Sequence, residues 1–145
     1  MAVTDVRIYR AAACDLEAVY AITQRTIAET YPQYYPAGTV SFFANYHSRE
    51  SLLRDIEYGV VLLAEVNGTA AGTGTVADGN YITRVYVLPE YQGNGCGARI
   101  IDELERIAAQ THDSAALDAS DGAYEMWIRR GYVSEKFTTE DAEDG

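Results

Sequence analysis

The segment between residues 87 and 98 has the composition of an anion-binding turn. Glycines at 93, 95 and 97 alternate with small or polar residues, directly after an apolar run that Pro89 ends. Residues without a side chain let the backbone approach a ligand closely, with its N–H groups turned inward. A helix after the turn adds the positive end of its dipole. The pattern favours a bound pyrophosphate, and the alternative is an ordinary glycine-rich surface turn.

Hydrophobic periodicity predicts the elements that position this turn. Strands are expected at 6–8, 60–66, 69–76, 81–88, 114–119 and 132–139, and helices at 16–27, 39–46, 48–57, 98–110 and 122–130. Asn67-Gly68 predicts a type I′ hairpin turn, and Asp78-Gly79-Asn80 predicts a second turn. The first strands are therefore antiparallel and the later ones parallel. We expect one α/β domain over 1–145, an α+β sandwich whose mixed, partly antiparallel central sheet has helices on both faces.

The turn also matches a dinucleotide-binding pattern. Gly93-x-Gly95-x-x-Ala98 fits that pattern, and Asp118 lies near the distance expected for a ribose-binding carboxylate. Such a fold needs several more βα units after the turn, and only one fits into the remaining residues. The preceding hairpins also disagree with it. Binding of NAD therefore stays the lesser alternative.

A second block of sequence, residues 117–132, favours another family. Together with Gln92-Gly93-Asn94-Gly95-Cys96-Gly97, it resembles the GNAT superfamily of acetyl-CoA-dependent N-acetyltransferases. The family signature is Gln/Arg-x-x-Gly-x-Gly/Ala, and the second block looks like its segment ending in aromatic-x-x-x-Gly-aromatic, here Trp127 to Tyr132. The resemblance spans residues 5–139 and implies a GNAT-like fold and acetyl-CoA as cosubstrate.

The resemblance implies that acetyl-CoA lies along the 81–88 strand and the glycine turn. Backbone groups of 85–87 would pair with the pantetheine arm, and N–H groups of 92–98 would hold the pyrophosphate. Ser120 stands where the family often has asparagine, and Ala123 and Trp127 would line the same groove. The implied cofactor-binding residues are Val85, Tyr86, Val87, Gln92, Gly93, Asn94, Gly95, Cys96, Gly97, Ala98, Ser120, Ala123 and Trp127.

Acetyl transfer needs an oxyanion donor, a proton acceptor and a leaving thiol. A strand-end N–H, of Val87 or Leu88, can stabilise the oxyanion. Where family members carry a glutamate base this sequence has Tyr81, a poor base expected to orient water. Where the family often has a tyrosine that acts as a general acid, this sequence has Trp127. Tyr124, three residues earlier, is the available substitute. The expected catalytic residues are Tyr124, Tyr81 and Leu88.

Three tyrosines beside prolines border the expected acceptor site. Tyr31, Tyr34 and Tyr35 are expected to line a substrate pocket and to stack on a cation; the alternative is packing of a proline-bounded loop. Cys96 is interpreted as a bystander thiol within the turn.

The acidic and histidine side chains receive simpler interpretations. Glu29, Asp55 and Glu57 are able to attract an amine, although a solvated acidic face is favoured. His47 and His112 stand among polar residues and are predicted to lie on the surface. No spacing of histidine, cysteine and carboxylate residues indicates a metal site.

Composition excludes several classes of partner. The 145 residues include 22 acidic and 11 basic side chains, for a net charge of −11. This charge repels nucleic acid phosphates and anionic membranes. No apolar run reaches the ~20 residues of a membrane helix, and the N-terminus lacks the apolar core of a secretion signal. We therefore expect a cytoplasmic protein.

The C-terminus departs from the family. Members commonly add one more strand after the segment corresponding to 132–139, whereas this chain has the acidic tail 140–145. A homodimer that covers the splayed end of the sheet is therefore expected. The favoured function is acetyl transfer from acetyl-CoA to a primary amine of a small molecule or protein. A non-catalytic acyl-CoA-binding or regulatory domain is the alternative, because the family's glutamate and tyrosine are missing.

Overall fold

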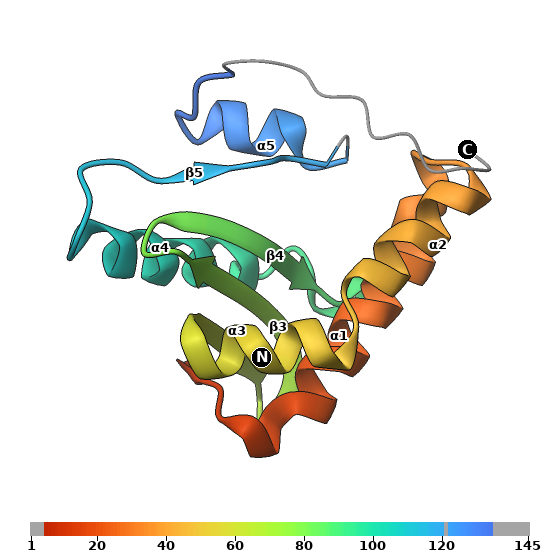
Figure 1. Cartoon of the computed structure of the whole chain (residues 1–145), viewed down its shortest axis with the longest axis horizontal. Coiled ribbons are helices and arrows are strands. Elements are labelled where there is room, and N and C mark those ends of the chain that lie inside the picture. Colours follow the sequence, from red (N-terminus) through yellow and green to blue (C-terminus); the bar gives the residue numbers. More distant parts are fainter. Residues whose placement is uncertain (1–4, 121, 135–145) are drawn as a thin grey trace.

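Five strands form one mixed sheet in the order β1-β2-β3-β4-β5 (Figure 1). The structure is a computed structural model that describes residues 5–120 and 122–134. The strands are β1 Val6–Arg10, β2 Val60–Val66, β3 Thr69–Ala77, β4 Tyr81–Val87 and β5 Ala116–Leu117. The helices are α1 Leu16–Thr30, α2 Ala37–Tyr46, α3 Arg49–Tyr58, α4 Cys96–Ala109 and α5 Tyr124–Arg129. The first four strands are antiparallel and β5 runs parallel to β4, which confirms the predicted fold class.

Two short turns set the register of the antiparallel strands. Asn67 and Gly68 both have positive φ angles, 51° and 84°, as a type I′ turn requires. This turn closes the β2–β3 hairpin with Val66 opposite Thr69. Asp78 and Gly79 also have positive φ, and they turn the chain from β3 into β4. Both turns were predicted from sequence.

The pleat of the sheet separates two hydrophobic cores. Val61 and Leu63 of β2 pack with residues of α1 and α3, whereas Leu62 packs with α4 on the other side. We call these sides the α1–α3 face and the α4–α5 face; Figure 1 shows α3 and α4 on opposite sides of the strands. Gly74 lets α4 approach closely, since an added Cβ would lie 2.6 Å from Ile100 Cγ2.

β4 and β5 pair over only two residues each, and beyond them the sheet has an opening between β4 and the segment that follows β5. Tyr81 pairs with Ala116 and Ile82 with Leu117; β5 then ends, while β4 continues to Val87. Arg84, with φ of 53°, lies where the β3–β4 register shifts, which marks a bulge in β4. Beyond Ile82, the outer edge of β4 therefore has no strand partner among the described residues.

The structure differs from the sequence prediction mainly near the C-terminus. The strand expected at 114–119 is reduced to β5, and the helix expected from 98 begins at Cys96. In the strand expected at 132–139, residues 132–134 are not in a strand, and 135–139 lie outside the described residues, as does the tail 140–145. Within the described chain, every helix is too short or too polar to cross a membrane.

Candidate active site

The glycine turn leads directly into α4. Gly93 and Gly95 both have a φ of 85°, and Gly95 is the N-cap of the helix. An added Cβ at either position would meet nothing within 4 Å, so the backbone conformation, rather than lack of space, calls for glycine. The first helical hydrogen bond runs from Arg99 N–H to Gly95 O, 3.1 Å. The N–H groups of 96–98 therefore have no acceptor within the helix and are suited to a diphosphate.

Two side chains fix the turn to the rest of the fold. Gln92 Nε2 donates to the carbonyl oxygen of Val87 at 2.9 Å, which joins the turn to the end of β4. Cys96 is 1% exposed within the core of the α4–α5 face, and burial raises the pKa of its thiol. A buried thiol of this kind is a poor nucleophile.

The outer edge of β4 carries a free backbone donor, but at a different residue from the one expected. Leu88 N–H donates to Ala71 O at 2.9 Å, so its proton is already used in the sheet. The prediction of Leu88 as the oxyanion donor is therefore wrong. Val87 pairs with Gly72, and the ladder bond made by Leu88 shows that this is a non-hydrogen-bonded pair. The N–H of Val87 accordingly points to the outer edge, and alternation places Val85 on the same edge.

Helix α5 is fastened to α4 rather than exposed along a groove. Trp127 is 5% exposed and packs edge-to-face on Tyr132, with ring centroids 5.0 Å apart. The Tyr132 hydroxyl donates to Glu105 at 2.7 Å, and Arg130 forms ion pairs with Glu105 and Asp102. Trp127 thus lies in the core of the α4–α5 face, although we had expected it along the cofactor groove.

Ala123 and Tyr124 lie at the start of α5. Ala123 is partly buried against the same core, and Tyr124, the first residue of the helix, is half-buried. Tyr124, which the sequence predicts as the general acid, therefore lies at the N-terminal end of α5.

On the α1–α3 face, side-chain hydroxyl groups form hydrogen bonds across the opening between β4 and the segment after β5. The hydroxyls of Tyr31 and Tyr86 lie 3.1 Å apart, and Tyr31 also forms a hydrogen bond with Ser120. Burial raises the pKa of both phenols; in Tyr31 the hydrogen bonds with Tyr86 and Ser120 oppose that effect. Both phenols are therefore protonated near neutral pH. Through these hydrogen bonds Tyr31 connects Tyr86 of β4 to Ser120 in the segment after β5.

The other two tyrosines of the predicted acceptor pocket pack around Tyr31. Tyr34 is 48% exposed and covers Gly122, where an added Cβ would lie 2.8 Å from its Cε2 atom. Tyr35 contacts the rings of Tyr31 and Phe43, with centroids 5.4 and 5.5 Å away. The structure thus brings all three tyrosines to the side of the opening that faces α2.

Tyr81 and Asp118 meet at the closed end of the β4–β5 opening. The Tyr81 hydroxyl donates to Asp118 Oδ2. Partial burial, then this carboxylate, and then Tyr46 raise the pKa of Tyr81. Tyr81 therefore keeps its proton and acts as a donor. Asp118 entered the sequence analysis only as a ribose ligand, and its place opposite Tyr81 depends on the parallel pairing of β4 and β5.

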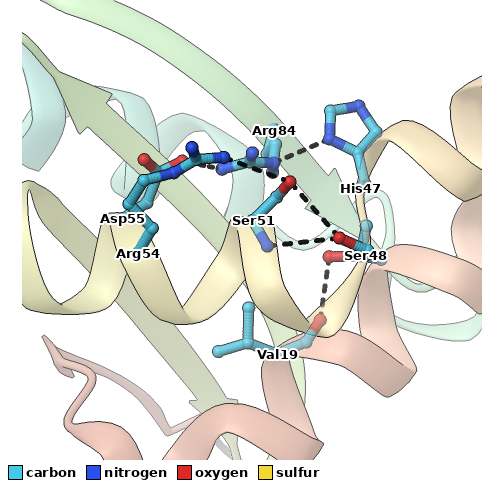
Figure 2. A network of polar contacts seen from close by, with 8 residues as sticks. Val19, His47, Ser48, Ser51, Arg54, Asp55 and Arg84 are labelled. Carbon is cyan, nitrogen blue, oxygen red and sulfur yellow. Dashed lines mark hydrogen bonds and ion pairs between the residues drawn. The ribbon is translucent and has the colours of Figure 1, made fainter.

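A buried polar network joins β4 to the end of α2 and to α3 (Figure 2). The Arg84 side chain, 7% exposed, forms an ion pair with Asp55 and donates through Nε to His47 Nδ1 at 2.7 Å. His47 is 7% exposed, and burial, with a smaller effect of Arg84, lowers its pKa to about 4. Because Nδ1 accepts this hydrogen bond, the proton of the neutral ring is on Nε2.

The network corrects two sequence interpretations. His47 was predicted on the surface, but the α2–α3 junction folds it against Tyr86, with ring centroids 6.3 Å apart. Asp55 was interpreted as part of a solvated face, but it is paired with Arg84. Glu57 and His112 are exposed, as expected, and Glu29 is exposed and pairs with Arg25.

These groups define a site that opens on both faces of the sheet. The glycine turn and α4 lie on one side, and the hydroxyl and aromatic groups lie on the other. The two sides meet at the outer edge of β4. A family model described as an acetyltransferase (GNAT) domain matches residues 30–145. The chain belongs to the GNAT acetyltransferase family.

Solved structures of acetyltransferases are similar to this chain in fold. A GCN5-related N-acetyltransferase from Rhodopseudomonas palustris is 24% identical, with a TM-score of 0.89 over 100% of this chain and 92% of the other. PaiA N-acetyltransferase from Thermoplasma acidophilum, in complex with coenzyme A, is 19% identical, with a TM-score of 0.74 over 95% and 94%. A predicted acetyltransferase from Clostridium acetobutylicum, with acetyl-CoA, is 17% identical, with a TM-score of 0.68 over 97% and 99%.

Proposed function

We propose that the protein transfers the acetyl group of acetyl-CoA to a primary amine, of a small molecule or a protein, by direct attack in a ternary complex. The observation that carries this proposal is the outer edge of β4 beyond Ile82, which pairs with no strand among the described residues. It lies between a turn suited to a diphosphate and a face lined with hydroxyl and aromatic groups. Holding both substrates at this edge would supply much of the rate.

Acetyl-CoA would bind through backbone groups. The N–H groups from Gly93 to Ala98 would hold the pyrophosphate, because the first turn of α4 leaves its N–H groups without helical acceptors. The Gln92 N–H, expected in the same role, already donates to Pro89 O at 3.3 Å. The pantetheine arm would pair with β4 at Val87, as an added strand does, and would bring the acetyl group to Val85. Ala123 would border the arm from α5.

The chemistry needs a neutral amine and a stabilised oxyanion. One proton of the ammonium passes to a water molecule, which the Tyr81 hydroxyl would orient, and from there to solvent. The freed nitrogen lone pair attacks the thioester carbonyl, and the N–C bond forms as negative charge moves to oxygen. The Val85 N–H, which lies on the same outer edge and farther from the turn, would donate to this oxygen. Collapse then breaks the C–S bond, and a second proton from nitrogen ends on the sulfur of CoA. Tyr124 would assist that protonation.

Calorimetric titration with acetyl-CoA, with NAD as the control ligand, tests the cofactor. We expect micromolar binding of acetyl-CoA and no heat from NAD. A free-thiol assay with a panel of amines then tests turnover, and Tyr124→Phe is expected to lower kcat by more than about tenfold. Absence of acetyl-CoA binding would overturn the proposal, and an unchanged kcat would remove Tyr124 from the mechanism.

One observation favours a non-catalytic acyl-CoA-binding domain as the second candidate. Tyr81 keeps its proton and Trp127 is buried, so neither position at which the family has its base or acid is able to serve that role here. Binding of acetyl-CoA without thiol release from any amine in the panel would support this candidate.

A further inference from the structure

We propose that Arg84 is a positioning residue: Asp55 and His47 hold it in a left-handed backbone conformation, so that the N–H of Val85 faces the outer edge of β4. This inference rests on the proposed function, in which that N–H donates to the oxyanion. Arg84 would touch neither substrate itself and would act through the backbone of its neighbour.

The β4 bulge has an arginine where glycine is the usual residue. The pairs on either side of Gly74 in β3 leave two residues of β4, Arg84 and Val85, opposite it. Arg84 has a φ of 53°, and bulges whose first residue is left-handed usually have glycine there. Asn67 and Asp78, the other non-glycine residues with positive φ among those described, lie in turns. Because the left-handed conformation is unfavourable for a residue with a Cβ, another interaction must hold Arg84 in it.

The bulge changes which backbone groups face the outer edge of β4. Before it, the Asn80 carbonyl accepts a hydrogen bond from Ala116 at 3.0 Å, so even-numbered residues turn their backbone groups outward. After it, the N–H of Leu88 is used in the sheet, so the odd-numbered Val85 faces outward instead. Without the extra residue, the N–H of Val85 would point towards β3.

The side chains of β4 change faces at the same point. Ile82 and Tyr86 are four residues apart and would share a face in a regular strand. Ile82 instead packs in the core of the α4–α5 face, and Tyr86 packs in the core of the α1–α3 face. The bulge therefore sets both the hydrogen-bonding edge and the packing of the second half of β4.

Two elements of the α1–α3 face fix the Arg84 side chain (Figure 2). The guanidinium forms an ion pair with Asp55 of α3, and its Nε donates to His47 Nδ1, at the end of α2, at 2.7 Å. The side chain is 7% exposed, so a backbone change that moved it away from these partners would leave a buried charge unpaired. This cost opposes relaxation of the positive φ, and the network thereby holds the bulge.

Glycine and alanine at position 84 separate positioning from stability. Arg84→Gly and Arg84→Ala both remove the network and leave Asp55 unpaired, but only alanine keeps a Cβ that disfavours positive φ. We expect Arg84→Ala to lower kcat at least about tenfold, with the KM for acetyl-CoA within about threefold, because the glycine turn is unchanged. Arg84→Gly should keep a kcat at least about threefold above that of Arg84→Ala.

The matched control is Arg54→Ala. Arg54 is an exposed arginine of α3 that takes part in none of the ion pairs of the described chain. This variant should change neither kcat nor KM. A network that only stabilised the fold would instead make the glycine and alanine variants of Arg84 equally active.

A second pair of variants retains the ion pair between Arg84 and Asp55. His47→Asn offers Arg84 Nε an oxygen acceptor, whereas His47→Leu offers none and leaves a buried donor unpaired. The kcat of His47→Leu should lie at least about threefold below that of His47→Asn. Since the buried charge stays paired in both proteins, this comparison decides the question where Arg84→Ala does not fold.

The backbone amide resonance of Val85 in isotope-labelled protein gives a readout without turnover. Acetyl-CoA should shift this resonance in the wild type and in Arg84→Gly, and should leave it nearly unshifted in Arg84→Ala. Equal kcat values within either pair of variants, or a wild-type shift in Arg84→Ala, would overturn the inference while acetyl-CoA still binds. Absence of acetyl-CoA binding to the wild type would overturn the proposed function and the inference together.

Discussion

Replacing His47 by asparagine is expected to make the fold less sensitive to acid. The imidazole is buried between Tyr46 and Tyr86, and its Nδ1 accepts a hydrogen bond from Arg84. A proton on Nδ1 would remove that bond and place a second positive charge beside the guanidinium. The folded state therefore favours the neutral ring, and asparagine offers Arg84 an oxygen acceptor that does not titrate.

The sign and size of the change in stability with pH follow from the pKa of His47, which is lowered to about 4 in the folded protein. Below about pH 6.5 the unfolded chain takes up the proton and the folded chain does not, so the stability is present at higher pH and lost as pH falls towards 4. Between pH 8 and pH 5 this difference amounts to about 2 kcal/mol. For a domain of this length, that is about 6 °C in Tm.

Urea unfolding at pH 8, 7, 6 and 5 measures the effect. The wild-type free energy of unfolding should fall by about 2 kcal/mol more than that of His47→Asn over this range. His112→Asn, which removes an exposed imidazole, is the matched control and should follow the wild type. Parallel curves for wild type and His47→Asn would refute the reasoning. Lower stability of His47→Asn at pH 8 reports lost packing and does not affect the comparison of slopes.

Three further predictions concern packing, charge and backbone. Gly74→Ala should lower the free energy of unfolding by about 1–3 kcal/mol in urea, because the added methyl overlaps Ile100; an unchanged midpoint would contradict the close approach of α4. Asp55→Asn should cost about 3 kcal/mol in the same assay, since it leaves the buried charge of Arg84 unpaired, and a loss below about 1 kcal/mol would show that water reaches the pair. Gly95→Ala should destabilise the fold by about 1 kcal/mol through its positive φ and weaken acetyl-CoA binding in calorimetry; equal affinity would argue against the turn as the phosphate site.

Local rules made the turns predictable from sequence. Asn67-Gly68 adopts the two positive φ angles that a type I′ turn needs, and Gly95 takes the left-handed N-cap conformation before α4. These preferences depend on a few neighbouring residues. For the same reason, the periodicity of α1 and α4 was sufficient to find both helices.

The partners of the polar groups were not predictable in this way. Whether Leu88 or Val87 has a free N–H depends on the register with β3, and the meeting of Tyr81 with Asp118 depends on a short parallel pairing with β5. His47 stands among polar neighbours in the sequence, and only packing of the α2–α3 junction against β4 reveals its burial.

The sequence by itself determined the order of the elements, the phosphate-type turn and the GNAT resemblance, because side-chain periodicity and glycine conformations act over short stretches of chain. The tertiary structure alone decided which backbone donor is open, that Trp127 belongs to the core, and that Arg84 is neutralised while Asp118 has no charged partner in the described chain. Hydrogen bonds and ion pairs act over a few ångströms, and residues far apart in sequence come within that range only when the strands take their register.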